Sequence, residues 1–294
     1  MIGYRLVLFT VVLTRVMIAA DKVSDIELSK KELGYTKKQI INFIQKTVRE
    51  ARVTTVIIGL SGGIDSTLTA YLAVEALGPG SVYGVVMPSK SNSKQNMDDA
   101  IQVAKNLKIN YDVIEIDSIV DEIQHCVQNS SASAKFQKEF ENKTIGNIGG
   151  RVRAVILYTI ANSKSALVVG TGNKTEFLIG YFTKYGDGAV DFHPIANLYK
   201  CQVRQLSKYI SVPTKYISKP PTAGLWKDQT DEEEIGMDYD TLDSILFLSV
   251  EKNKKTETIS EELQIKKELV TLVNNLYINS AHKRNLPPSP QPID

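Results

Sequence analysis

A short glycine-rich segment carries the clearest chemical signal in this sequence. Residues 56–58 form an apolar β-branched run typical of a strand buried on both faces. Gly59-Leu60-Ser61-Gly62-Gly63-Ile64-Asp65-Ser66 follows, and residues 67–74 can continue as a helix. A strand, a glycine-rich turn and a helix bring free backbone N–H groups and the helix dipole against an anion. Because glycine has no Cβ, a phosphate can approach this backbone closely, and the two serines add hydroxyl donors. The segment therefore predicts a phosphate site.

Asp65 distinguishes this loop from the Walker loop, whose lysine contacts the β- and γ-phosphates. A carboxylate at this position is favourable if it holds Mg²⁺ against the phosphates. An ordinary strand–helix turn with a serine N-cap is the alternative interpretation. The pattern S-G-G-x-D-S resembles the pyrophosphate loop of the N-type ATP pyrophosphatases. Those enzymes cut ATP between the α- and β-phosphates and activate a substrate as its adenylate.

A second loop, Gly170-Thr171-Gly172-Asn173-Lys174-Thr175-Glu176, follows another predicted strand and forms a candidate opposite wall of the same site. Thr171 can donate a hydrogen bond to ATP, and Glu176 offers a second oxygen ligand for Mg²⁺. Glu176 is equally well interpreted as a first-turn carboxylate that favours the helix dipole. The residues alone leave both interpretations open.

Three later segments are also too polar or too rich in glycine and proline for a core. Residues 182–191 (FTKYGDGAVD) form a loop of a kind that is usually functional on a rigid α/β frame. Residues 219–226 (KPPTAGLW) form a rigid proline turn, and the acidic run 228–234 favours a helix start over a metal site.

Composition narrows the classes of protein. The chain has 294 residues, of which 43% are hydrophobic and 23% charged, as expected for one large α/β domain. A net charge of +2 gives no case for a general nucleic-acid binder. Two distant cysteines and three scattered histidines exclude a disulfide framework and a zinc spacing. His125 and Cys126 are adjacent, and adjacent helix residues point apart, so they do not predict a nucleophile pair.

Strands alternate with helices along the chain. Apolar patterns predict helices over residues 35–51, 96–107, 119–127 and 144–163, and strands over residues 81–87, 111–116 and 166–170. This order predicts an α/β fold with a doubly wound, mostly parallel sheet under right-handed crossovers. Ligands then bind at the carboxyl ends of the strands, near the point where the strand order reverses. The segments divide into an N-terminal extension (1–34), one domain (35–287) and a proline-rich tail (288–294).

The first twenty residues contain an apolar run that is too short for a membrane span. The run resembles a signal peptide, whereas ATP chemistry belongs in the cytosol. A non-native upstream start and an extra surface element are the alternatives. We expect a cytoplasmic protein with no membrane partner.

Six motifs occur in order between residues 61 and 287: SGGIDST, GNIGGRVR, GTGNKTE, FTKYGDG, the KPPTAGLW–DQTDE stretch, and HKRNLP. Together they closely resemble the ammonia-dependent NAD synthetases. The resemblance implies the three-layer sandwich of the adenine-nucleotide alpha-hydrolase-like, pyrophosphate-loop fold. It also implies that nicotinic acid adenine dinucleotide (deamido-NAD) is adenylated by ATP and then amidated by ammonia to NAD, with release of AMP and pyrophosphate.

The resemblance assigns roles to individual positions. Asp65, Lys184 and Lys200 would be catalytic, and Asp65 and Glu176 would hold Mg²⁺. The residues assigned to ATP, the co-substrate, are Gly59, Leu60, Ser61, Gly62, Gly63, Ile64, Asp65, Ser66, Thr171, Lys200 and Thr222. The residues assigned to the dinucleotide are Arg151, Lys184, Asp191, His282 and Lys283. The chain departs from the family pattern at Gly150, Ala154 and residues 187–189, close to Arg151 and Lys184.

Other pyrophosphate-loop proteins are the rival interpretations. A tRNA thiolase would usually need a cysteine pair or a zinc cluster. A fused glutaminase would need roughly 200 more residues, although a separate glutaminase subunit stays possible. A catalytically silent nucleotide-binding protein would not need both Asp65 and Glu176.

The resembling family also implies a homodimer whose dinucleotide pocket lies at the subunit interface. A set of apolar residues in the C-terminal half is expected beside the first-helix stripe of Ile40, Ile41 and Ile44, in excess of what one sheet covers. These residues are Leu242, Ile245, Leu246, Leu248 and Val250. We expect the tail residues His282 and Lys283 to close over the dinucleotide.

Overall fold

The structure is a computed structural model that describes residues 26–130, 140–224, 226 and 229–290. The interpretations of residues 1–20 as signal-like and of 291–294 as tail lie outside the described residues. Within the described ranges, no helix combines the length and the apolarity that a membrane span requires.

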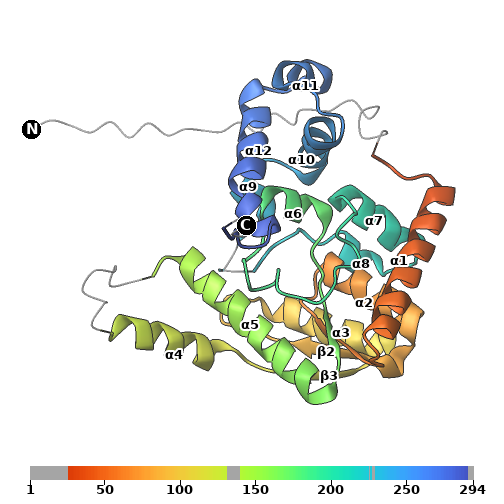
Figure 1. Ribbon diagram of the computed structural model, residues 1–294, viewed down its shortest axis with the longest axis vertical. Helices are drawn as coiled ribbons and strands as arrows, with labels where there is room; N and C mark the ends of the chain where they lie inside the picture. The colour runs from red at the N-terminus through yellow and green to blue at the C-terminus, as the bar shows by residue number, and fades with distance from the viewer. Residues whose placement is uncertain (1–25, 131–139, 225, 227–228, 291–294) are drawn as a thin grey trace, which may run out of the picture.

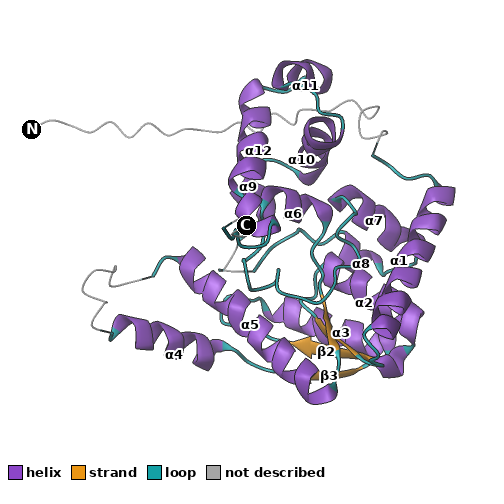
Figure 2. Ribbon diagram, in the orientation of Figure 1, coloured by secondary structure: helices purple, strands orange, loops and turns teal. Residues whose placement is uncertain are grey.

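Four parallel strands form the central sheet (Figure 2). They are β1 (Val56–Gly59), β2 (Val82–Val86), β3 (Asn110–Val113) and β4 (Leu167–Val169). Their order in the sheet is β3-β2-β1-β4, and every pairing is parallel. The chain moves outward from β1 to β3 and then returns to the other side of β1. The strand order therefore reverses between β1 and β4, where a ligand site is expected.

Helices cover both faces of the sheet. The helices up to residue 209 are α1 (Lys30–Glu50), α2 (Ile64–Leu77), α3 (Lys94–Leu107), α4 (Asp117–Gln128), α5 (Asn142–Lys164), α6 (Lys174–Ile179) and α7 (Lys200–Tyr209). Beyond them lie α8 (Thr214–Ile217), α9 (Asp231–Ile235), α10 (Tyr239–Leu246), α11 (Thr256–Leu263), α12 (Lys267–Asn279) and α13 (Ala281–Arg284).

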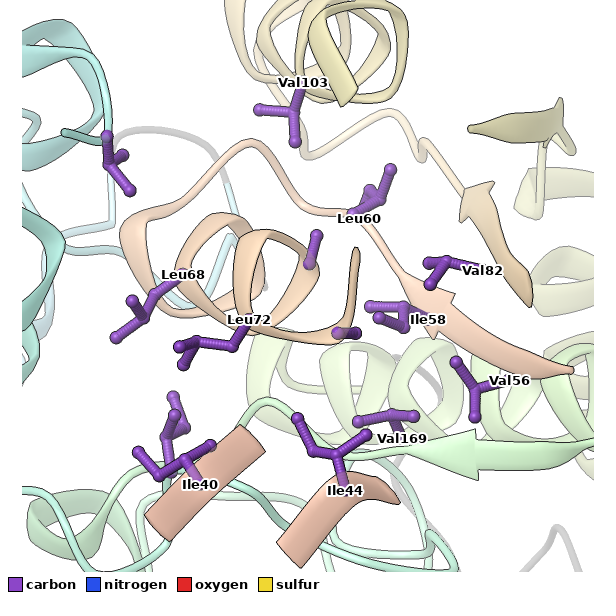
Figure 3. Close-up of a cluster of buried hydrophobic side chains, with 14 of the residues drawn as sticks. Ile40, Ile44, Val56, Ile58, Leu60, Leu68, Leu72, Val82, Val103 and Val169 are labelled. Atoms are coloured by element: carbon purple, nitrogen blue, oxygen red, sulfur yellow. The ribbon is translucent and has the colours of Figure 1, made fainter. Parts of the chain in front are cut away.

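Alternation along β1 produces the three layers. Val56 and Ile58 pack into one core with α1, α2, α3 and α7, whereas Ile57 packs into a second core with α4 and α5. Figure 3 shows the first of these cores, where Ile44 of α1 and Leu72 of α2 lie beside Ile58. The predicted α/β fold with a parallel sheet is confirmed.

The first helix begins earlier than expected. It starts at Lys30 rather than near residue 35, because the Ser29 hydroxyl accepts from Glu32 N while the Glu32 carboxylate accepts from Ser29 N. Ile26, just before the cap, is buried. The helix predicted over residues 35–51 therefore also includes residues 30–34, which had been expected in the N-terminal extension.

The C-terminal helices have a core of their own. Four of the predicted surplus residues are buried in this core with α11 and α12, and the fifth packs partly buried against it: Leu242, Ile245, Leu246 and Leu248, then Val250. Figure 1 shows α10, α11 and α12 grouped at one end of the sheet layers, away from most of α1. The prediction that these residues lie beside Ile40 and Ile44 and need a partner subunit is wrong, because the chain covers them itself.

Candidate active site

The loop after β1 has a shape that glycine permits. Gly62 has φ +76°, and a Cβ there would lie 2.3 Å from the Asn96 carbonyl oxygen of α3. Gly63 is the N-cap of α2 and donates its N–H to Ser61 Oγ at 3.2 Å. Asp65 thus stands in the first turn of α2, and the serine N-cap of the alternative interpretation is wrong.

A buried lysine joins the two loops that the sequence singled out. Lys200 Nζ lies 2.6 Å from Asp65 Oδ2 and 3.4 Å from Glu176 Oε1. Its side chain is only 3% exposed. Asn173 Nδ2 donates to Asp65 Oδ1 at 2.9 Å and links the loops a second time. The sheet therefore brings Asp65, Lys200 and Glu176 together at the carboxyl ends of β1 and β4; we call them the acidic cluster.

The two carboxylate oxygens of Glu176 make different contacts. Its backbone N–H donates to Asn173 Oδ1, and its Oε2 accepts from Asn173 N at 3.2 Å, which completes a capping box at α6. Its Oε1 faces Lys200. The capping box fixes the side chain, and the second oxygen stays available to the site.

Electrostatics make the acidic cluster receptive to a cation. Burial raises the pKa of the Glu176 carboxyl, and the Lys200 ammonium offsets this only in part. Burial opposes the charge of Lys200, but Asp65 and Glu176 outweigh it and raise the pKa of the ammonium. A further cation beside Asp65 and Glu176 would favour the ionised form of both carboxylates.

The donor set suits Mg²⁺. Among the described residues, no group of three histidines, cysteines or carboxylates forms an all-protein metal cage. Mg²⁺ usually needs one or two carboxylates, since phosphates and water complete its coordination. Asp65 and Glu176, which face the same Lys200 Nζ, fit that pattern.

A cavity of about 380 Å³ opens beside the acidic cluster. This volume lies within the range of small-molecule sites. The predicted residues that line it are Gly59, Leu60, Ser61, Gly63, Ile64, Asp65, Ser66, Thr171, Glu176, Lys200, Thr222 and Lys283. The predicted residues that do not line it are Gly62, Arg151, Lys184, Asp191 and His282.

Most of the residues assigned to the dinucleotide form a group of their own. Arg151 Nε donates to the Lys184 carbonyl at 3.3 Å, and Lys184 Nζ donates to the His282 carbonyl at 2.7 Å. Lys283 lines the cavity, and its Nζ lies 2.6 Å from both the Gly180 and the Phe182 carbonyl. Asp191 instead supports the sheet, where its Oδ2 accepts from Val168 N at 2.7 Å.

The cavity also uses residues that sequence reasoning missed. Arg153 lines it and holds Met87 O and Asn92 Oδ1 in place, whereas Arg151 is exposed. Helical spacing could have found this face, because Asn147, Gly150, Ala154 and Leu157 all line the cavity.

The acidic run 228–234 contributes residues to the cavity as well as to a helix. It does open a helix, α9, as predicted from its charge. Two of its carboxylates, Asp231 and Glu234, line the cavity as well. Asp231 Oδ1 accepts from Ala223 N at 2.8 Å and so ties the proline turn to the start of α9.

Comparisons with known proteins agree with this geometry. The family model described as NAD synthase matches residues 36–287. An NH(3)-dependent NAD(+) synthetase of Halobacterium salinarum is 44% identical, over 93% of this chain and 100% of the relative. One from Methanocaldococcus jannaschii is also 44% identical, over 88% of this chain and 98% of the relative.

Solved structures share the fold. The NMN synthetase of Francisella tularensis superposes with a TM-score of 0.76 at 32% identity, over 90% of this chain and 99% of that one. The NH3-dependent NAD synthetase of Campylobacter jejuni, in complex with the nitrate ion, gives 0.72 at 29% identity, over 90% and 100%. With a matched family model over most of its length, a 44% identical relative covered end to end, and the expected loops around one cavity, the chain belongs to the NAD synthase family.

Proposed function

We propose that this protein catalyses the ATP-dependent amidation of nicotinic acid adenine dinucleotide by ammonia, which yields NAD. The observation that carries the proposal is the acidic cluster beside the glycine-rich loop, in one cavity at the strand-order reversal. The similarity of the chain to NH(3)-dependent NAD(+) synthetases supports the choice of substrate and nitrogen donor.

In the first half-reaction, the pyridine carboxylate attacks the α-phosphorus of ATP. A carboxylate–phosphorus bond forms and the bond to the β-phosphate oxygen breaks, so that pyrophosphate leaves. Lys200 would stabilise negative charge at the phosphorus, since its ammonium is fixed and shielded from water. Asp65 and Glu176 would hold Mg²⁺, which neutralises phosphate charge when bound.

In the second half-reaction, ammonia attacks the acyl carbon, AMP leaves, and the new amide loses a proton. No protein nucleophile is needed. Cys201 is buried, and burial raises the pKa of its thiol. Cys126 does not line the cavity, and its hydrogen bond to Glu122 raises the pKa of its thiol. Neither cysteine is therefore a reactive thiolate, which favours free ammonia over glutamine as the donor.

We also propose a homodimer formed by α4 and α5. Large apolar side chains stay exposed on these helices: Ile119 (41%), Ile123 (38%) and Val127 (39%) of α4, and Val155 (66%) of α5. The three α4 residues repeat every four positions and so form one stripe. Arg151 lies one turn from Val155, so a second copy at this surface would approach Arg151 and its neighbour Lys184. In such a dimer, the exposed Arg151 could contact a dinucleotide bound at the subunit interface.

The function is tested with the purified chain, ATP, Mg²⁺, ammonium and nicotinic acid adenine dinucleotide. We expect one pyrophosphate released for each NAD formed, measured by mass detection. Glutamine in place of ammonium should give no NAD. Nicotinic acid mononucleotide is offered in parallel because an NMN synthetase shares the fold. Pyrophosphate release that requires neither pyridine acid would contradict the proposal.

Because its co-substrate is ATP, we place the enzyme in the cytoplasm.

A further inference from the structure

A second charged group contacts the glycine-rich loop. Lys219 Nζ lies 2.8 Å from Asp99 Oδ2 and 3.3 Å from the Gly62 carbonyl oxygen. The Asp99 side chain is 7% exposed, and Lys219 lines the cavity. Lys219 therefore lines the cavity and contacts the glycine-rich loop at the same time.

This group carries a net positive charge. Lys215 Nζ lies 3.0 Å from the other oxygen of Asp99, Oδ1. Burial opposes the charge of Asp99, but the two lysines outweigh it and lower the pKa of the carboxyl. Two ammonium groups around one carboxylate leave one positive charge in excess. Lys215 is 51% exposed and does not line the cavity, so Lys219 presents that charge to the site.

Of the other four cations that line the cavity in the described ranges, three are engaged elsewhere, and the fourth, Lys143, is exposed at the start of α5. Lys200 belongs to the acidic cluster, and Lys283 donates to the Gly180 and Phe182 carbonyls. Arg153 donates to Met87 O, Ser89 Oγ and Asn92 Oδ1. Within the described chain, Lys219 is the cavity-lining cation that donates to the backbone of the glycine-rich loop.

We propose that Lys219 binds the pyrophosphate end of ATP and the departing pyrophosphate, and that Asp99 is the residue that positions it. The inference rests on the proposed function, because it assumes that ATP occupies this cavity. A fixed ammonium beside the loop neutralises charge as it accumulates on the leaving group. The glycine-rich loop would then serve two groups, one with carboxylates suited to a metal ion and the other with an ammonium suited to phosphate.

Binding of inorganic pyrophosphate and of AMP, each with Mg²⁺, tests the assignment by calorimetry. Lys219→Met should weaken pyrophosphate binding by roughly 10- to 100-fold, as expected for a lost hydrogen bond to a charged group. AMP lacks the β- and γ-phosphates, so its affinity should change by less than about 2-fold. Lys219→Arg keeps the charge and should restore most of the pyrophosphate affinity.

Lys215→Met is the matched control, because it removes the other lysine from the same carboxylate outside the cavity. It should weaken pyrophosphate binding much less than Lys219→Met does, because it removes no group that lines the cavity. Asp99→Asn should weaken pyrophosphate more than AMP, whereas Asp98→Asn, at the exposed neighbouring position, should change neither.

Unchanged pyrophosphate affinity in Lys219→Met would overturn the inference. Equal losses of AMP and pyrophosphate, or equal effects of Lys215→Met and Lys219→Met, would also overturn it, because they indicate a purely structural ion pair. If the unmodified chain forms NAD but these losses are absent, only this inference fails. If the unmodified chain forms no NAD and binds no ATP, the proposed function fails as well.

Discussion

At the scale of the residue, the main feature of this site is a single ammonium between two carboxylates. Lys200 contacts two carboxylates. Asp65 follows β1 in the sequence, and Glu176 follows β4. Removing either carboxylate would take away one of the two partners of a buried ammonium, so the three side chains act as a unit. Their spacing along the chain hides this, because more than a hundred residues separate Asp65 from Glu176.

Asp65→Asn and Glu176→Gln should each lower kcat by at least about 100-fold, since an amide keeps the size but loses the charge that Mg²⁺ needs. Gln at position 176 can still complete the capping box, so the fold should survive. Pyrophosphate release checks the rate and circular dichroism checks the fold. Asp98→Asn is the exposed control. Near-normal turnover in either variant would remove that residue from the metal site.

His193 gives the fold a pH dependence separate from that of the reaction. Its ring packs edge-on against Phe177, with centroids 4.6 Å apart, and a Cβ at Gly170 would lie 2.1 Å from Nδ1. Burial lowers the pKa of His193 to about 4. The unfolded chain, with a histidine pKa of about 6.5, therefore binds the proton first as the pH falls.

Stability from His193 should be complete above pH 6.5 and be lost as the pH falls toward 4. The loss should reach up to about 3 kcal/mol. Urea unfolding at pH 7 and pH 4.5 measures this difference. His193→Gln should reduce it, while His125→Gln, at an exposed position, should leave it unchanged. An identical pH dependence in His193→Gln would exclude a buried, neutral histidine.

The sequence predicted the residues that share a loop better than those that share a helix face. The loop residues from Gly59 to Ser66 were predictable because glycine spacing directly encodes backbone shape. Arg151 and Arg153 both stand in α5, and only the three-dimensional path of that helix decides which of them meets the cavity. Lys219 was passed over since its partner Asp99 is on another element.

At the scale of the element, α7 takes its N-terminal support from other helices. The Lys200 backbone N–H donates to Thr175 Oγ1 of α6 at 2.9 Å, and Cys201 N donates to Asp243 Oδ2 of α10 at 2.8 Å. Thr175 Oγ1 in turn donates to Asp243 Oδ1 at 2.5 Å. The C-terminal helical core is thereby joined to the residue that carries the buried ammonium.

Thr175→Val should destabilise the protein by about 1–3 kcal/mol, because it leaves buried polar groups without a partner. It should also lower kcat, since the start of α7 loses a fixed position. Urea unfolding and pyrophosphate release measure the two effects. Thr271→Val, on the exposed side of α12, is the matched control and should have little effect on either. Wild-type stability in Thr175→Val would show that this connection is unimportant.

Prediction of the elements succeeded where periodicity was strong and failed where an element depends on distant partners. The strands and long helices of the sheet layers follow the apolar pattern. The start of α1 was readable from Ser29-x-x-Glu32, a capping box that was overlooked. The separate C-terminal core could not be foreseen, because apolar helices look alike whether they cover a sheet or one another.

At the scale of the whole molecule, the proposed dimer depends on the exposed apolar stripe of α4. Ile123→Asp would place a charge in that interface, and the desolvation cost should shift the protein from dimer to monomer. Sedimentation velocity measures the change. Leu286→Asp is the control, because Leu286 is 90% exposed and lies outside α4 and α5. A wild-type chain that sediments as a monomer would contradict the proposed assembly.

The lining of the cavity also determines when the protein can first act during its synthesis. Of the residues that line the cavity, Gly59 comes first in the sequence and Lys283 comes last. At about 5–20 residues per second, a ribosome needs roughly 10–45 seconds to pass from the first to the second. A growing chain therefore has its glycine-rich loop long before it has a complete pocket. A nucleotide that needs all of these walls should stabilise completed chains over partly made ones.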